Sequence, residues 1–181
     1  MVLADGSAEL PPAALTLWSA PGCYKLTLPM KSKRLMQERI RRVTVLFHEL
    51  GYEITESDVG EDSYSAGFVA PDGFQAGLFV DADSKFLELA FTFAFASEMA
   101  NFVRERIEEA MHSLYEFGCY FSLQTNQQEI TYTVFSKIYF AGLNYFALKE
   151  TIRDFREALE ANQEIFDVPL DDEKGELDGD S

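Results

Sequence analysis

Two segments of this chain carry the same helix-ending pattern, and that pattern limits how the chain can fold. Residues 46–52 read Leu-Phe-His-Glu-Leu-Gly-Tyr, and residues 114–120 read Leu-Tyr-Glu-Phe-Gly-Cys-Tyr. In each segment a glycine, Gly51 or Gly118, follows the last apolar position of a helical pattern. Glycine is the usual residue at such a position, because it enters the left-handed region without a Cβ clash. Alternating strand-like residues follow both segments, so the chain is predicted to run helix, strands, helix, strands, helix.

The spacing of apolar residues predicts the individual elements. Helices are expected over residues 32–50, 98–117 and 142–166, with Ser32 and Ser97 as N-caps of the first two. Strands are expected over residues 52–55, 64–70, 74–80, 86–95, 119–125 and 130–140, with residues 58–63 as a turn or loop. The segment 86–95 has five large apolar residues on one face and only Glu88 as a charge, which indicates an inner strand.

The connections between these strands indicate the fold class. Pro71-Asp72-Gly73 and Asn126-Gln127-Gln128 are short turns, and short turns join antiparallel strands. We therefore expect an α+β fold: an antiparallel sheet of about five to six strands, helices mainly on one face, and the order α-β(3-4)-α-β2-α. A single domain over residues 32–166 would follow a partly ordered N-terminal arm, residues 1–31. An acidic tail, residues 167–181, has few apolar residues to bury and is expected to be disordered.

Composition and charge exclude several function classes. The chain has 181 residues, 47% of them hydrophobic, and a net charge of −16, which disfavours direct contact with nucleic acid. No run of apolar residues is long enough to span a membrane, and no secretory signal is evident, so a cytoplasmic location is expected. One stretch, residues 31–42, is basic. It is interpreted as a solvated helix face or an intramolecular partner of the acidic body, with binding to an acidic partner or lipid as the alternative.

The sequence contains no clear catalytic or metal-binding motif. His48 and His112 fall on the polar sides of their helices, without the partners that acid–base catalysis needs. Cys119 has aromatic neighbours and no base, so a buried structural thiol is favoured over a nucleophile. Cys23 and Cys119 form no CxxC or Cys/His cluster, and the glycines form no phosphate-binding loop. We therefore expect no catalytic residues, no metal site and no cofactor.

Aromatic residues provide the one candidate site. If the large apolar residues of segments 86–95 and 130–140 face the helices, the opposite sheet face carries four aromatic side chains: Phe79, Tyr120, Phe135 and Tyr139. Aromatic residues on that face need cover. The N-terminal arm or the first helix could provide it; alternatively, these four residues bind a protein partner or form a dimer interface.

The element order and three local motifs resemble the YbjN family of bacterial proteins, sometimes labelled sensory transduction regulators. The motifs are Leu50-Gly51-Tyr52, the hairpin over residues 74–95 and the entry to the third helix at Gly142-Leu143-Asn144. The similarity covers residues 33–166. It implies a fold similar to class I type III secretion chaperones, with the order α–β–β–β–α–β–β–α, and small, acidic, often dimeric proteins without enzymatic activity. It supplies no catalytic residues.

Two functions remain open on these observations. The first is a non-enzymatic protein-binding module, a regulator or chaperone that holds a protein client or partner. The resemblance implies that it forms homodimers through the second helix or the last hairpin. The second is a small-ligand-binding protein or an enzyme whose pocket is assembled from scattered residues. The first is favoured, because the two His and two Cys lack partners in the sequence pattern.

Overall fold

The computed structural model describes residues 29–167, and it describes side chains from residue 33 onward. Within the described residues the fold is α+β, with a six-stranded antiparallel sheet and three α-helices, as the sequence predicts. The predicted arm up to residue 28 and the predicted tail from residue 168 lie outside the described residues. The elements in chain order are α1 (Pro29–Glu49), β1 (Glu53–Val59), β2 (Ser63–Val69), β3 (Gln75–Asp81), β4 (Phe86–Ala96), a 3₁₀ turn η1 (Ser97–Met99), α2 (Ala100–Glu116), β5 (Tyr120–Thr125), β6 (Glu129–Tyr139) and α3 (Tyr145–Ile165).

The strands are ordered β1-β2-β3-β4-β6-β5 across the sheet. β4 and β6 pair along their whole lengths, from Phe86 opposite Tyr139 to Ala96 opposite Glu129. The prediction of an inner strand over residues 86–95 is confirmed, because β4 lies between β3 and β6. β1 and β5 are the two edges.

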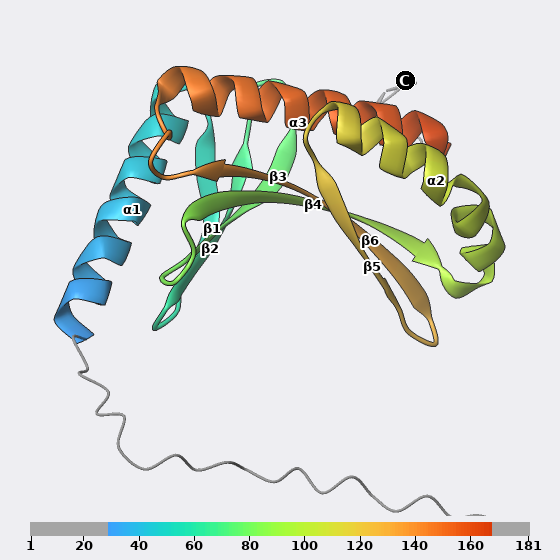
Figure 1. Ribbon diagram of the computed structural model, residues 1–181, viewed down its shortest axis with the longest axis horizontal. Coiled ribbons are helices and arrows are strands. Elements are labelled where there is room, and N and C mark those ends of the chain that lie inside the picture. The colour runs from blue at the N-terminus through green and yellow to red at the C-terminus, as the bar shows by residue number, and fades with distance from the viewer. Residues whose placement is uncertain (1–28, 168–181) are drawn as a thin grey trace, which may run out of the picture.

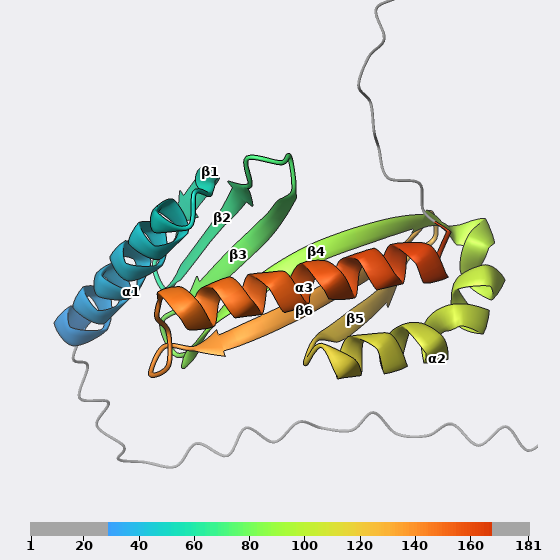
Figure 2. The same ribbon diagram turned by 90° about the horizontal axis from the view of Figure 1, so that it is seen from above.

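The helices cover one face of the sheet (Figure 1 and Figure 2). α3 runs across this face, α2 lies beside it over the β5–β6 side, and α1 lies at the β1–β3 side. The core forms between helices and sheet, as the contact of Phe47 in α1 with Phe68 in β2 illustrates: their ring centroids are 4.8 Å apart. The sheet curves so that the face turned away from the helices is concave (Figure 1). Within the described residues, no helix is long and apolar enough to cross a lipid bilayer.

The two repeated segments end their helices in the same way. Gly51 has φ of 84° and Gly118 has φ of 67°, so both adopt the left-handed conformation. After each glycine, a backbone N–H donates five residues back: Tyr52 N to Phe47 O and Cys119 N to Leu114 O, both at 2.9 Å. In each case the accepting carbonyl is one that the helix itself leaves without a hydrogen-bond donor. The repeated pattern therefore encodes two equivalent helix ends.

The predicted helix starts at Ser32 and Ser97 are wrong. α1 begins at Pro29, where proline is favoured because the first helical position needs no backbone N–H. Ser97 begins the 3₁₀ turn, and its backbone N–H donates to Gln128 O at 3.1 Å, which ties this corner to the β5–β6 turn. α2 then begins at Ala100 without a side-chain cap.

β1 is longer than predicted. Asp58 and Val59, which were expected in a turn, continue the strand and pair with β2. The register shifts between Thr55 and Asp58, and Glu56 has φ of 47°. Such a bulge interrupts the period-2 pattern from which a strand is recognised, so the second half of β1 resembles a loop in sequence.

Candidate functional site

The concave face of the sheet carries the candidate site, and we call it the open face. The strand registers decide which residues belong to it: Ser65 lies opposite Phe79, Phe79 opposite Glu88, and Glu88 opposite Lys137. The next row runs across all six strands. Its members are Thr55, Gly67, Gly77, Ala90, Phe135 and Tyr120.

All four predicted aromatic residues lie on the open face. Phe79 is 37% exposed and Tyr139 is 55% exposed, while Tyr120 and Phe135 are partly buried. The alternative that the first helix covers them is wrong, because α1 packs on Phe68, which points to the opposite face. The other alternative, cover by the N-terminal arm, concerns residues outside those described.

Tyr120 and Phe135 form the centre of an aromatic cluster. Their rings stack with centroids 5.4 Å apart. The Lys137 ammonium lies 4.9 Å from the Tyr120 ring centroid and 5.3 Å from that of Phe86, and Phe86 makes an edge contact with Tyr139. Lys137 thus makes cation–π contacts with both rings, because the face of an aromatic ring carries partial negative charge.

Tyr120 also links the cluster to Glu88. Its hydroxyl donates a hydrogen bond to Glu88 Oε1. Burial raises the pKa of Tyr120, and the neighbouring Glu88 carboxylate raises it further. Tyr120 is therefore a neutral hydrogen-bond donor at physiological pH, and the Glu88 carboxylate accepts its hydrogen bond.

A cleft of about 780 Å³ lies beside this cluster, over β1 to β4. Gly67, Gly77 and Ala90 are adjacent in the register and form its floor. Phe79 is the predicted site residue that lines the cleft. Among the residues that line it, Glu56 is the one ionisable side chain. The other lining residues with side chains on the open face are Thr55, Ser65, Val69, Gln75 and Thr92.

The two glycines of the floor differ in how much space a side chain would have there. A Cβ at Gly67 would lie 2.6 Å from Thr55 Oγ1, so the Thr55 side chain occupies that space. A Cβ at Gly77 would meet nothing nearer than Ala90 O at 3.5 Å, an ordinary contact. Glycine inside a strand lowers stability, and it often marks a place where another group approaches the backbone. No close contact among the described residues requires glycine at position 77, which lies in the floor of the cleft.

The sequence analysis did not include these glycines in the site. A signal was present, because Gly67 and Gly77 each lie five residues from Asp72, the centre of the predicted turn. A hairpin centred there must pair them, as the structure does. What the sequence could not supply is their place next to Ala90, which depends on the pairing of β3 with β4.

The residues considered for catalysis lie away from the open face. His48 and His112 are exposed on α1 and α2. Cys119 is buried, and burial raises the pKa of its thiol to about 11. The thiol therefore stays protonated at neutral pH, as a structural cysteine does. Within residues 29–167 no group of three or more His, Cys, Asp or Glu could hold a metal ion.

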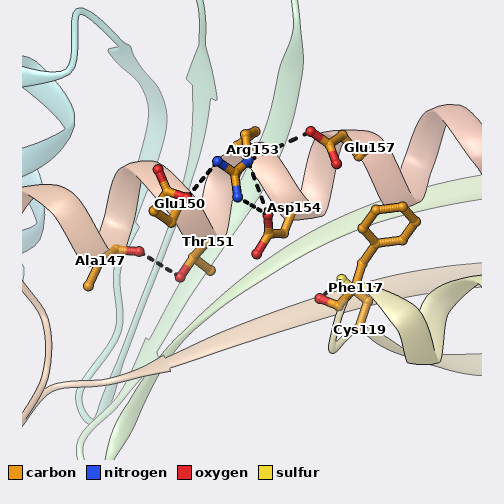
Figure 3. Close-up of polar contacts among 8 residues, drawn as sticks. All are labelled: Phe117, Cys119, Ala147, Glu150, Thr151, Arg153, Asp154 and Glu157. Carbon is orange, nitrogen blue, oxygen red and sulfur yellow. Dashed lines mark hydrogen bonds and ion pairs between the residues drawn. The ribbon is translucent and has the colours of Figure 1, made fainter.

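A cluster of ion pairs lies on α3, and Figure 3 shows it together with Cys119, which lies between α2 and β5. Arg153 contacts Glu150 at 2.6 Å, Asp154 at 2.8 Å and Glu157 at 3.7 Å. The Arg153 side chain is 56% exposed, so these pairs are surface contacts that contribute little stability. The cluster has the spacing of ordinary helix salt bridges rather than of a reactive site.

The basic stretch of α1 acts partly within the molecule. Arg39 donates to the backbone carbonyls of Asp81 and Ala82 and stacks over Phe140 at 4.6 Å. Arg42 donates to the carbonyls of Phe140 and Leu143, between β6 and α3. The intramolecular interpretation thus holds for two arginines, although backbone carbonyls rather than acidic side chains accept their bonds.

Comparisons with known proteins support the fold alone. No protein-family model matches the chain, and no curated protein matches it. The structure is similar to the crystal structure of an uncharacterized protein from Methanothermobacter thermautotrophicus, with a TM-score of 0.55 and 21% sequence identity. The similarity covers 73% of this chain and 97% of that chain. The resemblance to the YbjN family stays a prediction; its element order has three strands between the first two helices, where the structure has four.

Proposed function

We propose that this protein is a non-enzymatic protein-binding module, a YbjN-like regulator or secretion-chaperone-like protein whose open face holds a segment of a protein partner. The observation that carries this proposal is the open face itself. It presents partly exposed aromatic side chains beside a cleft that the helices, all on the other face, leave uncovered. Aromatic residues around a concave surface are typical of protein-binding sites, because they bury a large area with few rotatable bonds.

Affinity capture with two matched double variants tests this function. Phe135→Asp with Tyr139→Asp places two charges on the open face. Phe146→Asp with Val45→Asp places two charges on the helical side, away from α2 and β5, at side chains that are 75% and 46% exposed. We expect the wild-type protein and the helical-side variant to retain a stoichiometric partner from native lysate after cross-linking, and the open-face variant to lose it. Equal retention by all three would contradict the function, once circular dichroism has shown that both variants are folded.

A second function, binding of a small molecule, is supported by the cleft volume of about 780 Å³, which lies within the range of ligand sites. Catalysis there has less support, because Glu56 is the one ionisable side chain in the lining. A thermal-shift screen decides between the two functions. A metabolite that raises the melting temperature of the wild type but not of Gly77→Val would favour the small-ligand function.

The proposal includes a homodimer in the cytoplasm. Exposed apolar side chains on α2 and β5 support self-association: Met111 is 48% exposed, Tyr115 82% and Leu123 44%. These elements are the second helix and the edge strand of the last hairpin, where the resemblance to the YbjN family implies a dimer interface. Light scattering over a concentration series tests it, and a constant monomer mass would contradict it.

A further inference from the structure

We propose that the cleft of the open face recognises a peptide segment that carries basic side chains at one end and apolar side chains at the other. This inference rests on the proposed function and specifies its partner. The open face differs in chemistry on the two sides of the cleft, and that difference both selects the class of peptide and sets its direction.

The end at β1 is acidic. Glu53 and Asp58 lie on the open face of this strand, opposite Val69 and Ser65, and Glu56 lines the cleft. All three side chains are exposed. None of them has an ion-pair partner among the described residues. Three exposed carboxylates at one end of a cleft favour a cationic group there and repel an anionic one.

Beyond the β4 side of the cleft, the open face at β6 and β5 is aromatic. Phe79 lines the cleft. The stacked pair of Phe135 and Tyr120 lies in the same row of the sheet as the floor residues, next to Ala90. An aliphatic or aromatic side chain placed there would bury apolar area against ring faces. Lys137 already lies over the Tyr120 ring, which makes this side unfavourable for a second cation.

The floor between the two sides is smooth and has no free backbone donors. Gly67, Gly77 and Ala90 lie in paired inner strands, so their backbone groups are engaged in the sheet. Four strand spacings separate Thr55 from Phe135, a distance of about 19 Å, which about six residues of extended chain would span. A suitable peptide thus carries Arg or Lys about six residues away from Phe or Leu.

The remaining described carboxylates of the open face do not reverse this polarity. Asp81 accepts hydrogen bonds from the backbone N–H groups of Asp83 and Ser84, and Glu88 accepts one from Tyr120. Glu129 lies at the far end of β6, opposite Ala96 and outside the cleft lining. The exposed charge at the cleft is therefore concentrated at β1.

Fluorescence anisotropy with three labelled peptides tests the inference on the full-length protein. The first peptide has two Arg separated from a Phe-Leu pair by six small polar residues. The second has Glu in place of both Arg, and the third has Ser in place of Phe and Leu. We expect the first to bind at least about tenfold more tightly than either of the others, a difference of about 1.4 kcal/mol.

Two pairs of variants separate local recognition from general attraction to an acidic protein. The β1 variant loses three charges through the substitutions Glu53→Gln, Glu56→Gln and Asp58→Asn. Its control, the α2 variant, loses three charges at exposed positions of α2 through Glu105→Gln, Glu108→Gln and Glu109→Gln. Gly77→Val places a valine side chain in the cleft, and Ala94→Val places one on the open face of β4 outside the cleft lining. We expect the β1 variant and Gly77→Val each to weaken binding of the first peptide about tenfold, and both control variants to leave it unchanged.

Several outcomes would overturn the inference. Equal weakening by the β1 and α2 variants would mean that net charge alone attracts the peptide. Unchanged binding in Gly77→Val would place the peptide elsewhere. Binding of the second or third peptide as tight as that of the first, but lost in Gly77→Val, would refute the basic and apolar specificity and leave the protein-binding function intact. That function fails separately, if affinity capture does not depend on Phe135 and Tyr139.

Discussion

The phenol of Tyr132 is the most demanding polar group in the core. Its ring is fully buried, and its hydroxyl donates to Asn162 Oδ1 at 2.7 Å. Asn162 is buried as well, and its amide donates to Ala158 O at 2.8 Å. Tyr132 of β6 and Asn162 of α3 thus satisfy each other's buried polar groups, and their hydrogen bond links α3 to β6.

We expect Tyr132→Phe to lower the free energy of unfolding by about 1–3 kcal/mol, because it leaves the Asn162 oxygen buried without a donor. The matched control is Tyr139→Phe, at a side chain that is 55% exposed, where a change within about 0.5 kcal/mol is expected. Urea denaturation followed by circular dichroism measures both. A Tyr132→Phe protein as stable as its control would show that the bond contributes nothing.

Cys119 should make stability depend on pH in the alkaline range. Burial raises the pKa of its thiol from 9.0 to about 11, so the folded state disfavours the thiolate. The stabilising contribution is complete below pH 9 and is lost as pH rises toward 11. Burial raises the pKa of Tyr132 too, which acts in the same direction at higher pH.

The corresponding measurement is the free energy of unfolding in steps from about pH 7 to about pH 10.5, on a Cys23→Ser background. We expect the alkaline decline to be shallower in Cys119→Ala than in the parent. Parallel curves would contradict the assignment. As a second readout, a thiol reagent should modify Cys119 slowly in the native protein and rapidly in denaturant.

At the scale of elements, the glycines at the two helix ends should contribute equally to stability. Gly51→Ala and Gly118→Ala place a Cβ in the left-handed conformation, which should lower the free energy of unfolding by about 1–2 kcal/mol each. Gly77→Ala is the control, because no backbone strain and no close contact opposes it. Thermal and urea unfolding measure all three. If Gly77→Ala destabilised the protein as much as the other two, the effect would not be specific to helix ends.

The attachment of α1 depends on arginines rather than on charge pairs. We expect Arg42→Met to destabilise the protein by about 1–2 kcal/mol, because the carbonyls of Phe140 and Leu143 lose their charged donor. Arg41→Met, at an exposed position next to it, should change stability by less than about 0.5 kcal/mol. Equal effects would indicate that general electrostatics holds the helix.

Sequence periodicity predicted which elements form and which face each buries, because burial of one face imposes a period of about 3.6 residues on a helix and of about 2 on a strand. It placed the apolar residues of β4 correctly, and it placed the helix ends at Gly51 and Gly118. It failed at the starts of α1 and α2, where Pro29 and a backbone bond from Ser97 replace the expected serine caps. It also ended β1 too early, since the bulge at Glu56 breaks the alternation.

At the scale of the whole molecule, the arrangement explains why four aromatic residues from three strands form one surface. Phe79 comes from β3, Tyr120 from β5, and Phe135 and Tyr139 from β6. Alternation within each strand predicted their common face. The cleft was not predictable in this way, because its floor requires β2, β3 and β4 to be neighbours in a known register, and strand order is a property of the complete sheet.

The distribution of charge also acts at this scale. The chain carries a net charge of −16, while α1 is basic and uses Arg39 and Arg42 for internal bonds. An acidic protein with an uncovered aromatic face can stay soluble, since mutual repulsion opposes association through the apolar surface. The same charge attracts basic segments, which agrees with the acidic end of the cleft at β1.

The most direct test of a partner on the open face is site-specific photo-cross-linking. A benzophenone amino acid is placed at Phe79 or Tyr139 on the open face, and at Tyr115 or Phe146 on the helical side, all of them at least 37% exposed. After irradiation in native lysate, we predict one discrete adduct of the same partner from Phe79 and Tyr139, and none of that partner from Tyr115 or Phe146. Adducts confined to Tyr115 and Phe146, or no discrete adduct from the open face, would contradict the central claim.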